Sequence, residues 1–206
     1  MPDGQPEPKE KELDEAEAAY HEAGHCYVAA KDTWRLVDHV RIFKQKKGWS
    51  GTTGVQNAHE QSPSVTTIAV AGLVTEAKFV AIQKDTINNQ IHISVNIVEH
   101  VEDYVKKYKS LSGVGKKGRQ IDIPILPGMD QVAEASISED DAKLMPSLYR
   151  NYGTIKSSLE HVTSICNTPA KWAMIDKLAK AIMAAKGRKL HLKQINHILN
   201  IPLPEY

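Results

Sequence analysis

The chain has 206 residues, of which 41% are hydrophobic, so it is long enough to bury one substantial core. Its 26 basic and 25 acidic residues nearly cancel, which gives no reason to expect nucleic acid or a membrane as a partner. The two cysteines form neither a CxxC pair nor a disulfide framework, and the start of the chain lacks the basic and apolar regions of a signal peptide. We therefore expect a cytoplasmic protein with reduced thiols.

A long helix is predicted close to the N-terminus. Residues 1–10 are rich in proline and charge and are expected to be a flexible tail. From about Lys11 to Lys31, alanine and glutamate dominate and acids fill the first turns, which favours a helix. Its expected core face consists of Ala16, Ala19, Tyr20, Ala23, Tyr27 and Ala30.

The remaining elements follow from periodicity and turn residues. Alternating apolar residues predict strands over 37–43 and 51–56, and helical spacing after Pro63 predicts a buried helix to about residue 83. Further helices are predicted over 91–109, 138–149, 154–165, 169–186 and 190–200, with Gly187 as a C-cap. The glycines and prolines of 110–135 indicate a long loop. The predicted fold is one mainly α domain, residues 11–206, with a small β-hairpin and an insertion at about 86–135.

The sequence His-Glu-Ala-Gly-His at 21–25 carries the strongest chemical signal. Residues four apart on a helix lie about 5–6 Å from each other on one face, so His21 and His25 can both reach one metal ion. Zinc accepts histidine nitrogen, and a catalytic zinc keeps one position for water. Glu22 lies beside the metal without binding it and can take a proton from that water and pass it to the leaving amine. The motif therefore predicts a zinc metallopeptidase.

A third protein ligand must come from another part of the chain. The three-histidine pattern HExxHxxGxxH is absent, because Val28 stands where its glycine would be. The candidates are the carboxylates of Glu76, Asp140 and Asp141, together with the distant histidines.

Several segments, in the same order, resemble the peptidase domain of the FtsH-type AAA+ proteases. AAYHEAGHCYVAA resembles the zinc helix of that family, VDHVRIF and SGTTG its edge strand and turn, IAVAGLVTEAKF its Gly-x-x-x-Glu helix, and SISEDDAKL the segment with its third ligand. The resemblance implies a helical FtsH-like peptidase fold, with Zn2+ on His21 and His25 and with Glu22 as the base.

The resemblance also assigns the third ligand and a supporting residue. The Ser-x-Asp order after Ser138 implies Asp140, whereas the apolar face of the predicted helix favours Asp141, so Asp141 remains a rival. Glu76 is expected to support the zinc helix through a hydrogen bond rather than to bind the metal.

A substrate-binding strand is the last feature that the resemblance implies. Residues 38–43, including His39, Val40, Arg41 and Ile42, would form an edge strand onto which an extended peptide adds through backbone hydrogen bonds. The alternative for this segment is an ordinary, protected sheet edge.

Two functional hypotheses remain open. The 206 residues contain no P-loop, since SGVGKKG at 112–118 lacks the required first glycine and final serine or threonine. The first hypothesis is therefore an ATP-independent zinc peptidase that cleaves unfolded or exposed protein segments, alone, as a homo-oligomer, or with a separate ATPase. The second is a zinc-stabilised binding or regulatory module that presents the insertion to a partner. An intact Glu22 favours the enzyme, because a purely structural zinc site needs no base.

Overall fold

The computed structural model describes residues 13–56, 63–83, 119–124, 132–137, 141 and 152–202. In this part of the chain the protein is mainly helical, as the sequence predicts, and the predicted hairpin belongs to a small three-stranded antiparallel sheet. The helical segments are α1 (Glu15–Tyr27), η1 (Val28–Asp32), α2 (Pro63–Gln83), α5 (Tyr152–Asn167), α6 (Pro169–Ala184), η4 (Lys186–Arg188) and α7 (Leu192–Leu199). The strands are β1 (Val37–Lys44), β2 (Trp49–Val55), β3 (Arg119–Pro124), β4 (Val132–Ile137) and β5 (Lys189–His191). The predicted tail 1–10, the predicted helix 91–109 and nearly all of the predicted helix 138–149 lie outside the described residues.

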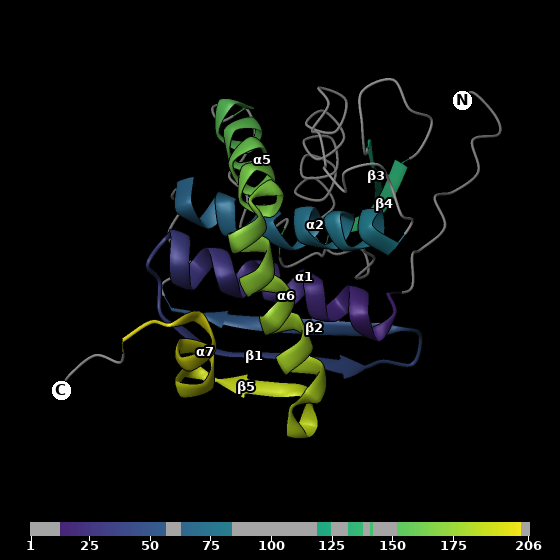
Figure 1. The fold of residues 1–206 in the computed structure, drawn as a ribbon. Coiled ribbons are helices and arrows are strands. Elements are labelled where there is room, and N and C mark those ends of the chain that lie inside the picture. The colour runs from purple at the N-terminus through teal and green to yellow at the C-terminus, as the bar shows by residue number, and fades with distance from the viewer. Residues whose placement is uncertain are drawn as a thin grey trace, which may run out of the picture.

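Helix α1 is the central element of the fold. Asp14 begins it with a capping box, in which its carboxylate accepts a hydrogen bond from the Glu17 backbone at 2.7 Å. The sheet lies on one side of α1, α2 lies on the other, and α6 crosses it (Figure 1). The prediction of a single core face is therefore wrong, because every residue from Ala18 to Ala30 is buried.

Helix α2 is apolar on all sides because it packs on both α1 and α5. Its 21 residues are enough to cross a membrane by length and composition, but 83% of its most apolar stretch is buried inside the protein. This burial is the pattern of a core helix. A close approach to α1 depends on Gly24, where a Cβ atom would lie 2.7 Å from the Ala71 carbonyl oxygen.

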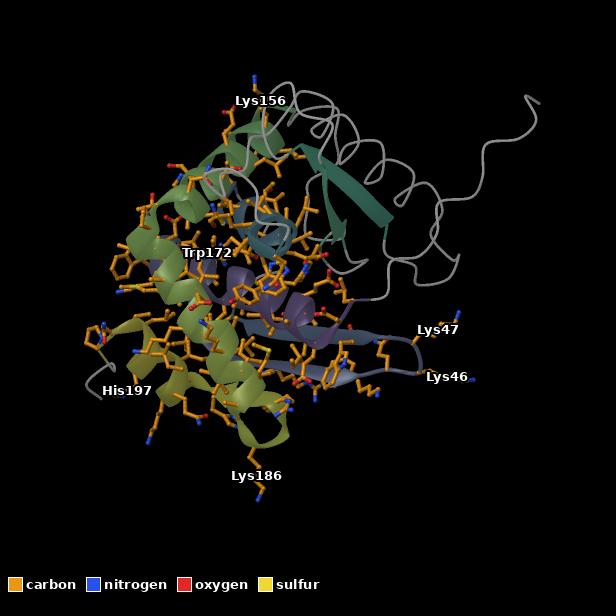
Figure 2. All side chains as sticks on the ribbon, turned by 45° about the vertical axis from the view of Figure 1, so that its right-hand side comes forward. Lys46, Lys47, Lys156, Trp172, Lys186 and His197 are labelled. Atoms are coloured by element: carbon orange, nitrogen blue, oxygen red, sulfur yellow. The ribbon has the colours of Figure 1, made fainter. Side chains whose placement is uncertain are left out.

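Tyr20 of α1, the residue before His21, stacks on aromatic side chains of both α2 and α6. The ring of Tyr20 stacks on Phe79 of α2 at 4.1 Å and on Trp172 of α6 at 5.6 Å between centroids (Figure 2 labels Trp172). The Tyr20 hydroxyl also donates a hydrogen bond to Asp176. These contacts hold this part of α1 in a defined rotation about its axis.

The sheet has the strand order β2-β1-β5, so β1 is its central strand. The predicted hairpin of β1 and β2 is confirmed, and its turn carries Lys46 and Lys47, which point away from the protein (Figure 2). The prediction that His39, Val40, Arg41 and Ile42 form an edge strand is wrong, because His39–Arg41 also pair with Lys189–His191 of β5. The prediction of one helix over 190–200 missed β5, in which Leu190 is buried opposite Val40.

Two further expectations need correction. The predicted loop 110–135 contains β3 and most of β4, which pair as an antiparallel hairpin from Arg119↔Ile137 to Pro124↔Val132. Ile121 and Ile123 alternate with polar residues there, a strand pattern that the surrounding glycines and prolines obscure. Gly187 is not the C-cap of α6, which ends at Ala184; its φ of 68° lies within η4, where the chain turns back toward β5.

Candidate metal centre

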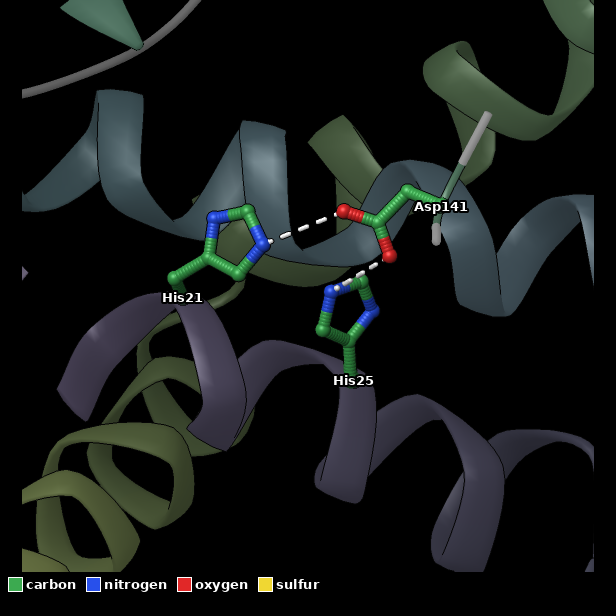
Figure 3. A group of neighbouring side chains, drawn as sticks. All are labelled: His21, His25 and Asp141. Carbon is green, nitrogen blue, oxygen red and sulfur yellow. Dashed lines mark hydrogen bonds and ion pairs between the residues drawn. The ribbon is translucent and has the colours of Figure 1, made fainter. Parts of the chain in front are cut away.

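Two buried histidines one helical turn apart form the base of the site. His21 and His25 are 5% and 6% exposed, and their ring centroids are 4.8 Å apart. Both side chains leave α1 on the side that faces α2, and both Nε2 atoms point to the same place (Figure 3). The spacing predicted from the sequence is therefore realised.

Asp141 supplies a carboxylate at that place. Its Oδ1 lies 3.1 Å from Nε2 of His25 and its Oδ2 lies 3.3 Å from Nε2 of His21 (Figure 3). The sequence leaves Asp141 as the rival of Asp140 for the third ligand, and Asp140 lies outside the described residues. The carboxylate that the structure places against both histidines is thus that of Asp141.

The outer ring nitrogens are held by acceptors on α2. Nδ1 of His21 lies 3.0 Å from Oε2 of Glu76, and Nδ1 of His25 lies 2.7 Å from the Ile68 carbonyl oxygen. A proton on each Nδ1 satisfies these acceptors and leaves the Nε2 lone pairs free to bind a cation. Glu76 therefore lies where the sequence analysis expected a supporting residue.

Gly72 makes room for the two rings. A Cβ atom at this position would lie 2.4 Å from Nε2 of His21 and 2.4 Å from Nε2 of His25. A Cβ atom at such distances would force the rings or α2 to shift, so glycine here lets α2 pass directly over the site. The two histidine rings therefore lie against the bare backbone of α2 at this glycine.

The ionisation of the cluster also favours a cation. Burial alone would raise the pKa of the Asp141 carboxyl, but the neighbouring His25 and His21 hold that pKa far below its usual range. Burial alone would lower the pKa of both histidines, but Asp141 raises the pKa of each, and Glu76 adds to the effect at His21. The Asp141 carboxylate thus favours positive charge on the two rings that it contacts, as expected where a cation would be bound.

These observations fit a metal ion. The ligand atoms of His21, His25 and Asp141 all lie within 4.8 Å of one another, and all three residues are buried. Two imidazole nitrogens and one carboxylate oxygen are a common donor set for divalent transition metals. The cluster can therefore hold a metal ion.

Glu22 lies beside these ligands but has a different partner. It is 6% exposed, and its Oε2 accepts a hydrogen bond from the Thr53 hydroxyl of β2 at 2.6 Å. Burial raises the pKa of the Glu22 carboxyl, although the two histidines and the Thr53 hydrogen bond partly offset this effect. A carboxylate of this kind is a stronger proton acceptor than one in open water.

Sequence reasoning missed Thr53, Gly72 and the Ile68 carbonyl. The Gly-x-x-x-Glu spacing could have indicated Gly72, since it places the glycine one turn before Glu76 on the same helix face. No sequence signal distinguishes Thr53 from its neighbour Thr52, and none indicates a backbone carbonyl. The predicted substrate strand His39–Ile42 has no contact with the site residues among the hydrogen bonds and ion pairs of the described part.

No protein-family model matches this chain, and no curated protein is significantly similar to it. The functional argument therefore rests on the geometry and chemistry of the site.

Proposed function

We propose that this protein is a zinc metallopeptidase that cleaves unfolded or exposed protein segments without ATP. The observation that carries the proposal is the position of Glu22, a buried carboxylate held by Thr53 beside a cluster of three metal ligands. A structural zinc site normally has four protein ligands and needs no base, whereas a catalytic site has three ligands, an open position and a base.

The HExxH motif is the reason to propose zinc among the divalent metals that these donors can bind. Histidine nitrogen and carboxylate oxygen bind zinc in hydrolytic enzymes, and the HExxH motif is characteristic of them. A bound zinc ion would supply a Lewis acid that makes water more acidic and polarises a peptide carbonyl. The resemblance to the FtsH-type peptidase domain supports the same metal and the same reaction.

The residues of the chain have separate tasks in this reaction. His21, His25 and Asp141 hold the metal, and the bonds from Nδ1 to Glu76 and to the Ile68 carbonyl fix the two rings. Glu22 accepts a proton from water and later returns it to the amine that leaves. Burial of Glu22 keeps competing water away from the carboxylate.

The substrate would add to β2 rather than to β1. β1 is covered on both sides, whereas β2 lies at the edge of the sheet, and among the described residues only the bridge from Leu13 to Trp49 lies on its outer side. Thr53 places this strand next to Glu22. A peptide paired with β2 would be gripped through its backbone, which gives little sequence preference and requires an extended, unfolded segment.

The test combines metal analysis with cleavage of an unfolded, casein-like substrate. We expect the wild type and Glu22→Gln to contain one zinc each, and only the wild type to release peptides, with or without ATP. Glu160→Gln, a change at an exposed glutamate on α5, is the matched control and should cleave like the wild type.

Zinc in both proteins with cleavage in neither would support the zinc-stabilised binding module instead. A wild type without metal would remove the basis of both hypotheses.

A further inference from the structure

The Thr53 hydroxyl lies close to two oxygen atoms of Glu22, the proposed base. Its hydroxyl lies 2.6 Å from Oε2 of Glu22 and 3.3 Å from the backbone oxygen of the same residue. A threonine hydroxyl has one proton, and the shorter distance shows that the carboxylate receives it. A hydrogen bond to an ionised acceptor is stronger than one between neutral groups.

Gly51 completes a slot for the Glu22 side chain. It lies two residues before Thr53 on β2, so both positions face the same side of the sheet. A Cβ atom at Gly51 would lie 2.3 Å from Cγ of Glu22 and 2.8 Å from its Oε1. The strand therefore touches the whole side chain: it contacts the methylene carbon at Gly51 and binds one carboxylate oxygen at Thr53.

Such a restraint has a clear chemical purpose. A glutamate side chain has several rotamers and loses entropy when it is fixed, so without the contact to Thr53 the Glu22 carboxylate would sample other positions. A carboxylate next to a cation can also bind the cation directly and fill the position that water needs. In the described part of the chain the hydrogen bonds to Glu22 occupy Oε2, which leaves Oε1 to accept a proton.

We propose that Thr53 is a positioning residue for Glu22. Its hydroxyl holds Oε2 against β2 and so restrains the Glu22 carboxylate, which would keep that carboxylate from binding the metal and leave Oε1 to accept a proton from water. This inference rests on the proposed peptidase function. Because β2 is an edge strand in the described part of the chain, Thr53 links the strand that would receive the substrate to the group that would accept the proton.

The first experiment compares two substitutions at one position. Thr53→Val keeps the shape and the strand preference but removes the hydroxyl, whereas Thr53→Ser keeps the hydroxyl. We expect Thr53→Val to lower kcat about 10- to 100-fold with little change in KM or zinc content, and Thr53→Ser to retain most of kcat. Thr52→Val makes the same change on the opposite face of β2, away from Glu22. It serves as the control for how loss of a threonine hydroxyl from this strand affects thermal stability.

The second experiment does not depend on turnover. Acetohydroxamic acid releases a proton when it binds zinc, and binding is tighter where a nearby carboxylate accepts that proton, so calorimetry measures the contribution of Glu22 to the affinity. We expect Thr53→Val to weaken acetohydroxamate binding in the wild type but to have no further effect in the Glu22→Gln background, which is the signature of two residues acting together.

Each outcome decides a separate point. Wild-type kcat in Thr53→Val, equal losses in the Val and Ser variants, or additive losses with Glu22→Gln would each overturn the role of Thr53. A wild type that binds zinc and acetohydroxamate but cleaves no peptide would count against the proposed function alone, because the binding cycle would still report on Thr53.

Discussion

Nδ1 of His21 lies 3.0 Å from Oε2 of Glu76, and Glu76 is fully buried in α2. The two residues are 55 positions apart in the sequence, so the contact exists only because α2 packs across α1. The carboxylate selects the tautomer with its proton on Nδ1 and aligns the ring, which leaves Nε2 to face Asp141.

This contact predicts that Glu76 controls metal affinity. We expect Glu76→Ala to lower zinc affinity about 10- to 100-fold, because the ring loses its acceptor and its fixed orientation. Glu76→Gln should lose less, since the amide oxygen still accepts the Nδ1 proton. Competition with a chromophoric chelator measures both affinities, and equal affinity in Glu76→Ala and the wild type would contradict the role of this contact.

Two adjacent aspartates provide the sharpest test of the ligand set. Asp141 contacts both histidines, so Asp141→Asn should abolish stoichiometric zinc binding under conditions in which the wild type is fully loaded. Asp140→Asn removes the same charge one residue earlier and should keep its zinc. Mass spectrometry of the native protein distinguishes the two variants, and loss of zinc in Asp140→Asn with retention in Asp141→Asn would reverse the assignment.

The sequence predicted those parts of the fold and site that depend on local patterns. The α1 helix, the β1–β2 hairpin and the placement of His21 and His25 on one face all follow from spacings within about ten residues. Strand β5 could not be predicted, because its three residues are too few to show alternation and they adopt an extended form by pairing with β1. The same strand overturns the expectation, taken from the resemblance, that β1 is a sheet edge.

The contacts between elements could not be read from the sequence either. Asp140 and Asp141 are adjacent acids near the start of a predicted helix, and the choice between them depends on how that segment approaches α1. Thr53 and Thr52 have the same side chain, and only the position of β2 under α1 decides which of them reaches Glu22. Sequence patterns therefore indicated His21, His25 and Glu22, and tertiary packing shows which residues contact them.

The close approach of Gly72 to the two histidine rings leads to a prediction about steric hindrance of zinc binding. Gly72→Ala should favour the helix by about 1 kcal/mol through backbone entropy alone. However, its Cβ atom would lie 2.4 Å from both Nε2 atoms and must push the rings apart, so we expect the variant to lose zinc binding. Circular dichroism and metal analysis measure the two effects.

Gly24→Ala is the matched control for this substitution. Its Cβ atom would meet Thr75 and the Ala71 backbone rather than the ligand nitrogens, so it should lower the melting temperature more than it lowers zinc content per folded molecule. Full zinc occupancy in Gly72→Ala would show that the rings can move aside without loss of the site.

The burial of the two cysteines leads to a prediction about the reactivity of their thiols. Burial raises the pKa of the Cys166 thiol to about 12, with a small opposing effect of Lys78, and burial also raises the pKa of Cys26. Neither thiol should react with iodoacetamide at pH 8.5 in the folded protein, and both should react in urea. Peptide mass spectrometry after brief alkylation reads this directly.

The same shift sets the direction of the pH dependence of stability. An unfolded thiol ionises near pH 8.5 and the folded Cys166 only near 12, so the unfolded state binds fewer protons between these values. The contribution of Cys166 is therefore complete below about pH 8.5 and is lost as the pH rises toward 12, with a slope of up to about 1.4 kcal/mol per pH unit. Urea unfolding from pH 8 to 10.5 should show a flatter decline in Cys166→Ala than in the wild type, even though the variant is less stable at pH 8 because of its lost packing. Parallel declines in the two proteins would mean that Cys166 ionises in the folded state as easily as in the unfolded chain.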